Sequence, residues 1–264
     1  FMGGGQLILA YEDFKAFVYA FMMWYWMVRL YARCPFVVFG VGVGDSFSWL
    51  DRILYRYVLK RCEYVYVRDL HSMAVLKEQF GVKAAYVPDV AFCYRAVFPR
   101  ESVPAENIAL VGPYDYGTYR RITADPKSRQ DYLNEWAEAV NRYERQGYAV
   151  RLVYTERRDK AFTLELSEFL RSRYGKETAV ADTDTLDKLV RELSRAKLIC
   201  SARMHALILG LEYGCQVEPV TISSKIRSFR ELYMRGTLDL EQMQTHIGQS
   251  LDAILSGTQH WQGG

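Results

Sequence analysis

The chain has 264 residues, of which 50% are hydrophobic and 25% charged, a composition that excludes disordered and fibrous proteins. Its length is sufficient for one large domain or for two smaller domains that each bury a core. The formal net charge of +3 is too small for a general nucleic-acid-binding protein, so we expect no nucleic-acid partner and only small anionic ligands.

Short β-branched and aromatic runs alternate with amphipathic stretches along the chain, a pattern typical of parallel sheets covered by helices. The predicted strands are residues 36–41, 64–67, 84–87, 108–111, 149–154, 179–181, 198–201 and 217–222. The predicted helices are residues 13–32, 46–61, 70–80, 127–146, 159–174, 183–196, 203–213 and 239–255. The sequence therefore predicts an α/β protein.

One segment breaks the alternation. Residues 94–106 carry Pro99 and Pro104 among mixed charges, which is typical of a linker between domains. We therefore predict an N-terminal α/β domain at 1–100, a C-terminal α/β domain at 106–240, and a C-terminal helix with a tail at 241–264.

The first predicted helix has an unusual composition, because aromatic residues crowd into residues 14–31. Its uncharged core, residues 16–28, is shorter than the roughly 20 residues that cross a bilayer. We favour a helix buried between sheet and solvent, and an interfacial membrane helix remains the alternative.

The cysteines and the N-terminus bear on the compartment. The five cysteines form no C-x-x-C pair and are odd in number, which predicts buried thiols in a reducing, cytoplasmic compartment. No signal peptide is visible. Because the chain begins at Phe1 rather than Met, we also expect N-terminal sequence to be missing.

The most informative segment is residues 197–211, in which an apolar strand ends at Ser201 and a helix begins with Arg203 and His205 in its first turn. Basic side chains are unfavourable at a helix N-terminus unless an anion lies there. The segment therefore predicts a phosphate or carboxylate site at the carboxyl end of a strand. The apolar periodicity of the helix places His205 off the packing face, and a histidine bonded to a neighbouring loop is the alternative.

A second strand-to-helix junction lies at residues 64–72. Asp69 is a good helix N-cap, and Ser72 could return the bond, so both have a structural explanation. Arg68 ends a buried strand and needs a partner for its charge, either a ligand anion or an internal carboxylate such as Asp89.

Other motifs are weaker. We interpret the glycine clusters at 3–5 and 40–44 as tight turns, residues 112–117 as a mobile loop, and residues 221–225 as a solvated loop or a phosphate contact. The sequence has no metal-ligand spacing, no G-x-S-x-G and no P-loop, so we predict no metal and no cofactor.

Taken in order, several of these segments resemble the polysaccharide pyruvyltransferase family over almost the whole chain. They are residues 3–7 (GGGQL), 35–44 (PFVVFGVGVG), 67–72 (VRDLHS), 87–91 (VPDVA) and 201–206 (SARMHA), with Gly214 and Lys225. The family is similar in fold to the GT-B glycosyltransferases, which implies two Rossmann-like domains facing across a cleft. The family's Gly-Asn-x-Gly-Asp-like loop precedes the triple glycine and is not in this chain, so the N-domain, the acceptor side, would be truncated.

The resemblance implies transfer of pyruvyl from phosphoenolpyruvate to a pair of sugar hydroxyls on a polysaccharide or a lipid-linked oligosaccharide, forming a ketal. Arg68 and His205 match the family's basic pair, with Arg203 and Lys225 near the donor. We expect His205 to be the acid/base with Asp69 or Asp89 as its partner, and Arg68 and Arg203 to clamp the anion. The remaining predicted substrate-binding residues are Ser201, Ser72, Gly4, Gly5 and Gly42.

Two alternatives stay open, a nucleotide-sugar glycosyltransferase of the same fold and a non-catalytic carbohydrate-binding module that docks through the aromatic helix at 14–31. We expect a cytoplasmic protein, free or peripheral at the inner face of the membrane. The sequence identifies neither the acceptor sugar and its ketal positions nor the oligomeric state.

Overall fold

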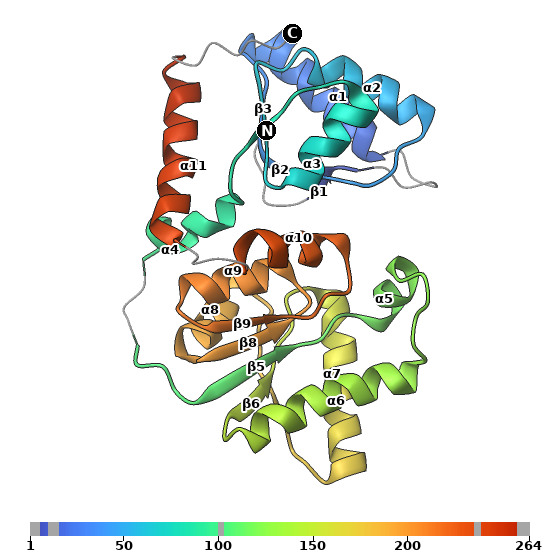
Figure 1. The fold of residues 1–264 in the computed structure, drawn as a ribbon, viewed down its shortest axis with the longest axis vertical. Helices are drawn as coiled ribbons and strands as arrows, with labels where there is room; N and C mark the ends of the chain where they lie inside the picture. Colours follow the sequence, from blue (N-terminus) through green and yellow to red (C-terminus); the bar gives the residue numbers. More distant parts are fainter. Residues whose placement is uncertain (1–5, 10–15, 100–102, 235–238, 258–264) are drawn as a thin grey trace. The chain divides into compact units, whose positions relative to one another are not determined.

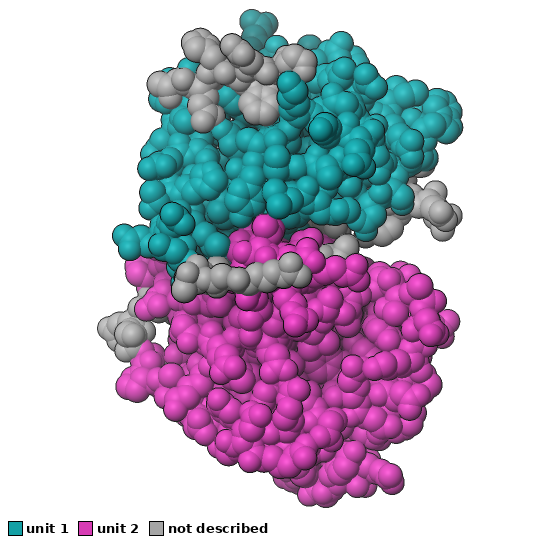
Figure 2. Space-filling model, viewed as in Figure 1, with its two compact units in different colours: residues 1–93, 239–264 teal, residues 94–238 magenta. Residues whose placement is uncertain are grey.

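The computed structural model describes residues 6–9, 16–99, 103–234 and 239–257. The chain divides into two compact units, unit 1 with residues 1–93 and 239–264 and unit 2 with residues 94–238. Figure 1 shows the elements of each unit, and Figure 2 colours unit 1 teal and unit 2 magenta. Each unit contains a parallel sheet with helices packed against it, which confirms the predicted α/β class.

The sheet of unit 1 has the order β1-β2-β3-β4, and all its neighbours are parallel. Its strands are β1 (Gln6–Ile8), β2 (Val37–Val43), β3 (Tyr64–Val67) and β4 (Ala85–Tyr86). Its helical elements are α1 (Ala16–Met27) with a π-helical turn (Val28–Ala32), α2 (Trp49–Leu59), α3 (Leu70–Val75) with a π-helical turn (Leu76–Phe80), a 3-10 turn (Val90–Cys93) and α11 (Leu240–Leu255). The core includes a cluster of edge-to-face aromatic rings from Phe21, Phe36, Phe47, Tyr55 and Phe80.

The C-terminal helix α11 belongs to unit 1. Its Gln244 amide donates to the Phe92 carbonyl at 2.8 Å, and the His246 ring lies 6.0 Å from that of Tyr86. The sequence alone predicts a separate helix and tail at 241–264, because nothing local indicates which sheet a helix at the end of a chain packs on.

The sheet of unit 2 has the order β7-β6-β5-β8-β9 and is again parallel throughout. Its strands are β5 (Ile108–Gly112), β6 (Ala149–Leu152), β7 (Ala179–Val180), β8 (Leu198–Ser201) and β9 (Gln216–Pro219). Its helices are α4 (Tyr94–Val97), α5 (Tyr116–Ile122), α6 (Arg129–Arg145), α7 (Arg157–Tyr174), α8 (Leu186–Arg195), α9 (Met204–Glu212) and α10 (Ser224–Tyr233). The central strands β5 and β8 are buried along their whole length.

The predicted strands at 64–67 and 198–201 have their observed bounds, and each predicted helix overlaps an observed one. The prediction missed β1, α4, α5 and α10. The loops predicted at 112–117 and 221–225 are shorter than expected, because residues 113–115 and 221–223 are loop whereas α5 begins at Tyr116 and α10 at Ser224. Residues 116–122 form a helix because Asp115 caps it and because the Tyr119 ring stacks on that of Tyr132 at 4.2 Å. That second contact is tertiary and has no local signal.

The glycines at 40 and 42 explain the repeated G-x-G pattern of β2. Gly40 has a φ of 66°, a value that favours glycine, at a register shift in the pairing of β2 with β3. A Cβ on Gly42 would lie 2.9 Å from both Nε and Nη2 of Arg68. The tight turns expected at 40–44 are thus wrong, because Gly40 and Gly42 lie inside a strand.

Gly210 of α9 offers a test of the packing of unit 2. A Cβ at this position would lie 2.6 Å from Cγ2 of Ile199 in β8, so Gly210→Ala forces α9 away from the sheet. We expect a loss of about 1–3 kcal/mol in the free energy of unfolding, measured by chemical denaturation.

The matched control is Gly248→Ala in α11, where a Cβ has no neighbour within 4 Å. This change removes only the conformational freedom of glycine inside a helix, so it is expected to stabilise by about 0.5–1 kcal/mol. Equal effects of the two substitutions would contradict the packing of α9 on β8.

Candidate active site

Three helices that begin at the carboxyl edge of the unit 2 sheet have no side-chain cap. They are α7, α9 and α10, which follow β6, β8 and β9 and have Glu156, Arg203 and Ser223 at the N-cap position. Two other helices at this edge, α5 after β5 and α8 after β7, are capped by Asp115 and Thr185. Uncapped backbone amides and the helix dipole together favour an anion at such an edge.

Arg203 occupies the N-cap position of α9, and its charge is balanced within the unit. Its Nε and Nη2 donate to the two carboxylate oxygens of Asp159 at 2.8 Å each. Its Nη1 donates to Glu156 at 2.7 Å, and its guanidinium lies 3.8 Å from the ring centre of Tyr114. We expected the basic residues here to need a ligand anion, but Arg203 already has two carboxylate partners.

Asp159 links the starts of three helices. Its side chain is fully buried in the first turn of α7, it accepts from the backbone N–H of Asp115 at 3.0 Å, and it binds Arg203 at the start of α9. A buried carboxylate is tolerated only when its oxygens are paired in this way. Asp159 and Arg203 therefore hold the starts of these helices together at the carboxyl edge of the sheet.

The other predicted residues of unit 2 lie at the same edge. Ser201 is buried at the end of β8, where its hydroxyl donates to the Gly112 carbonyl at 3.3 Å and accepts from the backbone N–H of Arg203 at 3.1 Å. His205 is exposed in the first turn of α9, and Lys225 is exposed in the first turn of α10. The predicted orientation of His205, away from the packing face, is confirmed.

In unit 1 Arg68 ends β3 and is buried, with only 4% of its surface exposed. Its Nη1 donates to the buried carboxylate of Asp89 at 2.7 Å, and its Nε lies 3.8 Å from that of Asp69. The internal carboxylate foreseen for Arg68 is therefore confirmed. Gly42 lies against the guanidinium, so this position has no room for a larger residue.

Asp69 and Ser72 form the start of α3. The Asp69 carboxylate accepts from the backbone N–H of Ser72 at 2.6 Å, which confirms the N-cap. The Ser72 hydroxyl accepts instead from the backbone N–H of Val43 at 2.9 Å, so its predicted return bond to the cap is wrong. Ser72 therefore joins the start of α3 to the end of β2.

The predicted site is divided between the units. Arg68, Asp69, Ser72, Asp89 and Gly42 belong to unit 1, whereas Ser201, Arg203, His205 and Lys225 belong to unit 2. The two candidate carboxylate partners of His205 are thus in the other unit, and that partnership stays a prediction. Gly4 and Gly5 lie outside the described residues.

Sequence reasoning missed two groups at these edges. Asp159 and Glu156 lie more than 40 residues from Arg203 in the sequence, so no local signal marks them as its partners. His71 and Asp45 were also missed, although Nε2 of His71 lies 2.6 Å from the Asp45 carboxylate at the carboxyl ends of β3 and β2. The position of His71 in the first turn of α3 and that of Asp45 just after β2 were the available signals.

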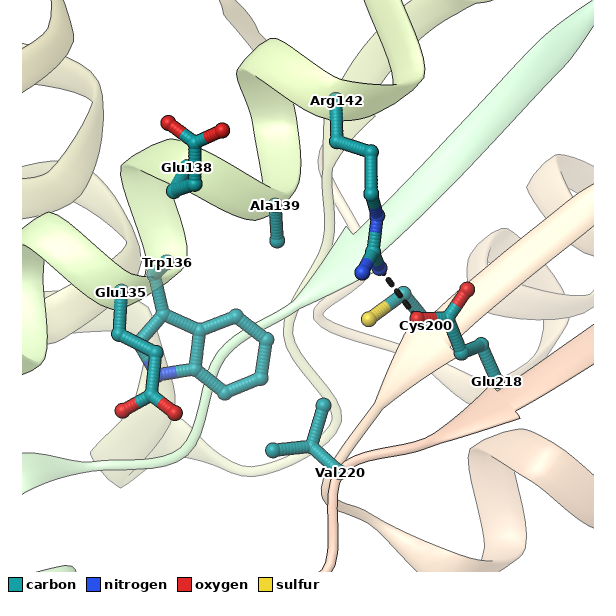
Figure 3. Close-up of a pocket in the computed structure, with 8 residues that line it drawn as sticks. All are labelled: Glu135, Trp136, Glu138, Ala139, Arg142, Cys200, Glu218 and Val220. Carbon is teal, nitrogen blue, oxygen red and sulfur yellow. Dashed lines mark hydrogen bonds and ion pairs between the residues drawn. The ribbon is translucent and has the colours of Figure 1, made fainter. Parts of the chain in front are cut away.

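A pocket of about 330 Å³ lies elsewhere in unit 2, between α6 and the strands β8 and β9. Figure 3 shows the Trp136 indole forming one wall and the Arg142 guanidinium turned toward Glu218 and Cys200. Its acidic side chains are already paired, Glu135 with Lys127, Glu138 with Arg145, and Glu218 with Arg142. None of the predicted site residues lines it in the described part of the chain.

The cysteines differ in burial. Cys200 and Cys215 are buried, as predicted, whereas Cys34 is exposed, so the prediction of buried thiols is wrong there. Burial raises the pKa of the Cys200 thiol to about 11 and those of Cys62 and Cys215 to about 12.

The link through Asp159 is testable by removing one partner of each ion pair. Asp159→Ala leaves the Arg203 charge and the Asp115 amide without their buried acceptor, so we expect a loss of about 3–5 kcal/mol in the free energy of unfolding. Glu156→Ala, in which a half-exposed carboxylate is removed, is the control and is expected to cost less than about 1 kcal/mol. Equal costs in chemical denaturation would contradict the link.

Thiol labelling tests the burial of the cysteines. With a thiol reagent at pH 8 the folded chain is expected to label rapidly at Cys34, and Cys34→Ser is expected to remove that fast phase. Labelling of Cys62, Cys200 and Cys215 should be slow and should rise about tenfold per pH unit below their pKa values, because only the thiolate reacts. Mass spectrometry of labelled peptides identifies each site, and rapid labelling of Cys200 would contradict its burial.

Comparison with known proteins adds to this geometry. No curated protein matches the chain. Among solved structures it is similar to Anabaena Alr3699/HepE in complex with UDP and glucose, with 11% sequence identity, a TM-score of 0.43, and coverage of 91% of this chain and 76% of that chain. The model of one family, polysaccharide pyruvyl transferase, matches residues 1–224, from the N-terminus through β9 to the start of α10. The chain therefore belongs to the polysaccharide pyruvyl transferase family.

Proposed function

We propose that this protein transfers pyruvyl from phosphoenolpyruvate to two hydroxyls of a sugar in a polysaccharide or a lipid-linked oligosaccharide, forming a ketal. Family membership supports pyruvyl transfer over the nucleotide-sugar and non-catalytic alternatives. The observation that carries the assignment of the donor site is the start of α9, which has no side-chain cap and presents exposed His205 at the carboxyl end of β8. Open α/β sheets bind their ligands at this end.

The proposed anion site consists of the N-terminal amides of α9 together with Lys225 in the first turn of α10. Phosphoenolpyruvate carries a phosphate and a carboxylate, which suit helix N-termini and an ammonium group. Arg203 has a different role in this proposal from the one expected at first. Held by Asp159 and Glu156, it fixes the direction of α9.

His205 is the proposed acid/base. Protonation of the enol CH2 at C3 gives a cationic C2, to which the first sugar hydroxyl adds. The C2–O bond to phosphate then breaks, and the second hydroxyl closes the ring. The two hydroxyl protons balance the one gained at C3 and the one carried away on phosphate, so the imidazole can return to its starting protonation state after each turnover.

Arg68 is the proposed residue of unit 1 that acts on the substrate. Asp89 accepts a hydrogen bond from Nη1 of its guanidinium, and Gly42, which has no side chain, leaves space for Nε and Nη2. The two residues together fix the orientation of the guanidinium. A guanidinium held in one orientation loses little conformational freedom when it binds a carboxylate or a phosphate. The scheme needs phosphoenolpyruvate and a sugar acceptor, and no metal or cofactor enters it.

Turnover with phosphoenolpyruvate tests the assignment. We expect His205→Ala to lower kcat by about 10²–10⁴, the usual contribution of an acid/base group, and Arg68→Ala to abolish the stabilisation by phosphoenolpyruvate in a thermal-shift assay. The matched controls are His246→Ala on α11 and Arg171→Ala on α7, two exposed residues of the same types outside the site. Both controls should keep full activity.

The ligand series separates the alternatives. Phosphoenolpyruvate alone should raise Tm, whereas UDP-, GDP- and CMP-sugars should not. Stabilisation by a nucleotide sugar instead, or full turnover by folded His205→Ala, would overturn the proposal.

A further inference from the structure

The outer side of α1 is apolar throughout. The helix contains no charged residue, and only one side of it packs on the sheet, through buried Val18, Phe21 and Tyr25. Its exposed residues are Phe17, Tyr19, Met23, Trp24, Trp26 and Met27, which we call the aromatic face. Tyr19 and Trp24 keep about half of their surface in contact with solvent, at 54% and 49%.

The aromatic face is contiguous because its residues recur at helical spacing. Tyr19, Met23 and Trp26 follow one another at intervals of four and three, so each lies beside the next on the helix surface. Exposed Leu30 and Tyr31 extend the apolar sequence beyond Met27. Soluble monomers seldom expose a contiguous apolar patch of this kind without a binding role.

Basic side chains outnumber acidic ones in the segment that contains this face. Among the described residues 16–63 the exposed acidic side chains are Glu63 and Asp45, and Asp45 is paired with His71. The exposed basic side chains of the same stretch are Arg29, Arg33, Arg52, Arg56, Lys60 and Arg61. Arg61 lies over the ring of Tyr57, and that ring contacts Tyr25 and Trp26 of α1. The Arg56 guanidinium, by contrast, lies near Gly81, after α3.

This combination indicates which partner fits. Trp and Tyr have an apolar body and a polar tip, which suits the boundary between headgroups and acyl chains. A second copy of this chain placed on the same face would bring basic side chains together, because a two-fold interface pairs like with like. An anionic bilayer instead offers apolar volume and negative charge at one surface.

We propose that the aromatic face docks on the surface of an anionic phospholipid bilayer, with α1 in the interfacial plane and the surrounding Arg and Lys side chains on the headgroups. The helix lies on the membrane and does not cross it. In the described part of the chain, no helix has the length and apolarity that crossing a bilayer requires. The proposal concerns this surface alone and does not depend on the proposed reaction.

The test is flotation of the whole chain with vesicles of phosphatidylcholine, alone or mixed with phosphatidylglycerol. We expect binding to the mixed vesicles, and quenching of tryptophan fluorescence by lipids brominated near the headgroup. Trp24→Glu combined with Met27→Glu should lower binding by at least about tenfold, because two apolar anchors are replaced by charge. Arg29→Gln combined with Arg33→Gln should lower binding to the anionic vesicles by about fivefold per charge and leave that to neutral vesicles unchanged.

The matched control is Leu164→Glu combined with Leu186→Glu, two leucines of unit 2 that are each 50% exposed. This variant should bind as the original chain does. Circular dichroism and Tm establish that every variant is folded, and sedimentation velocity measures self-association. Failure of the original chain to bind the mixed vesicles would overturn the proposal. So would unchanged binding by the folded α1 variant, or an effect of that variant on self-association alone.

Discussion

The buried pairing of Arg203 with Asp159 is the interaction on which the carboxyl edge of the unit 2 sheet depends. Removing Asp159 from water is costly, and two guanidinium bonds with one backbone bond offset that cost. These bonds reach the starts of α5, α7 and α9. They therefore fix the positions of the three helix N-termini relative to one another. His205 lies two residues after Arg203 in the first turn of α9. The ion pair that fixes the start of this helix therefore also orients the exposed imidazole.

Unit 1 contains a buried arginine–aspartate ion pair of the same kind. Arg68 follows β3 as Arg203 follows β8, and each is neutralised by a buried aspartate from a distant segment. The close approach of Arg68 to β2 then dictates a residue without a side chain at Gly42. A motif that looks like a phosphate-binding glycine cluster thus has a structural explanation in the space that an arginine occupies.

The parts that could be predicted from the sequence are those with a local cause. Strands β3 and β8 are continuous apolar runs, and the spacing of apolar residues in α9 was sufficient to place His205 outside the core. The partners of Arg203 could not be predicted, because a carboxylate 44 residues away has no local signal. Helix α10 was also missed, although a favourable N-cap residue, Ser223, precedes it in the sequence.

Helix α1 shows the limit of composition as a guide to burial. A helix that is apolar all round is expected to be buried, and the sequence therefore favoured a buried helix packed on the sheet over an interfacial one. The sheet covers only one side, and that side is sufficient to hold the helix through Val18, Phe21 and Tyr25. The outward side chains bury part of their surface, and Trp26 packs on Tyr57, but the exposed part, 54% of Tyr19 and 49% of Trp24, adds nothing to the packing of unit 1. Their chemistry is better explained by a surface outside the chain that accepts apolar rings and attracts positive charge.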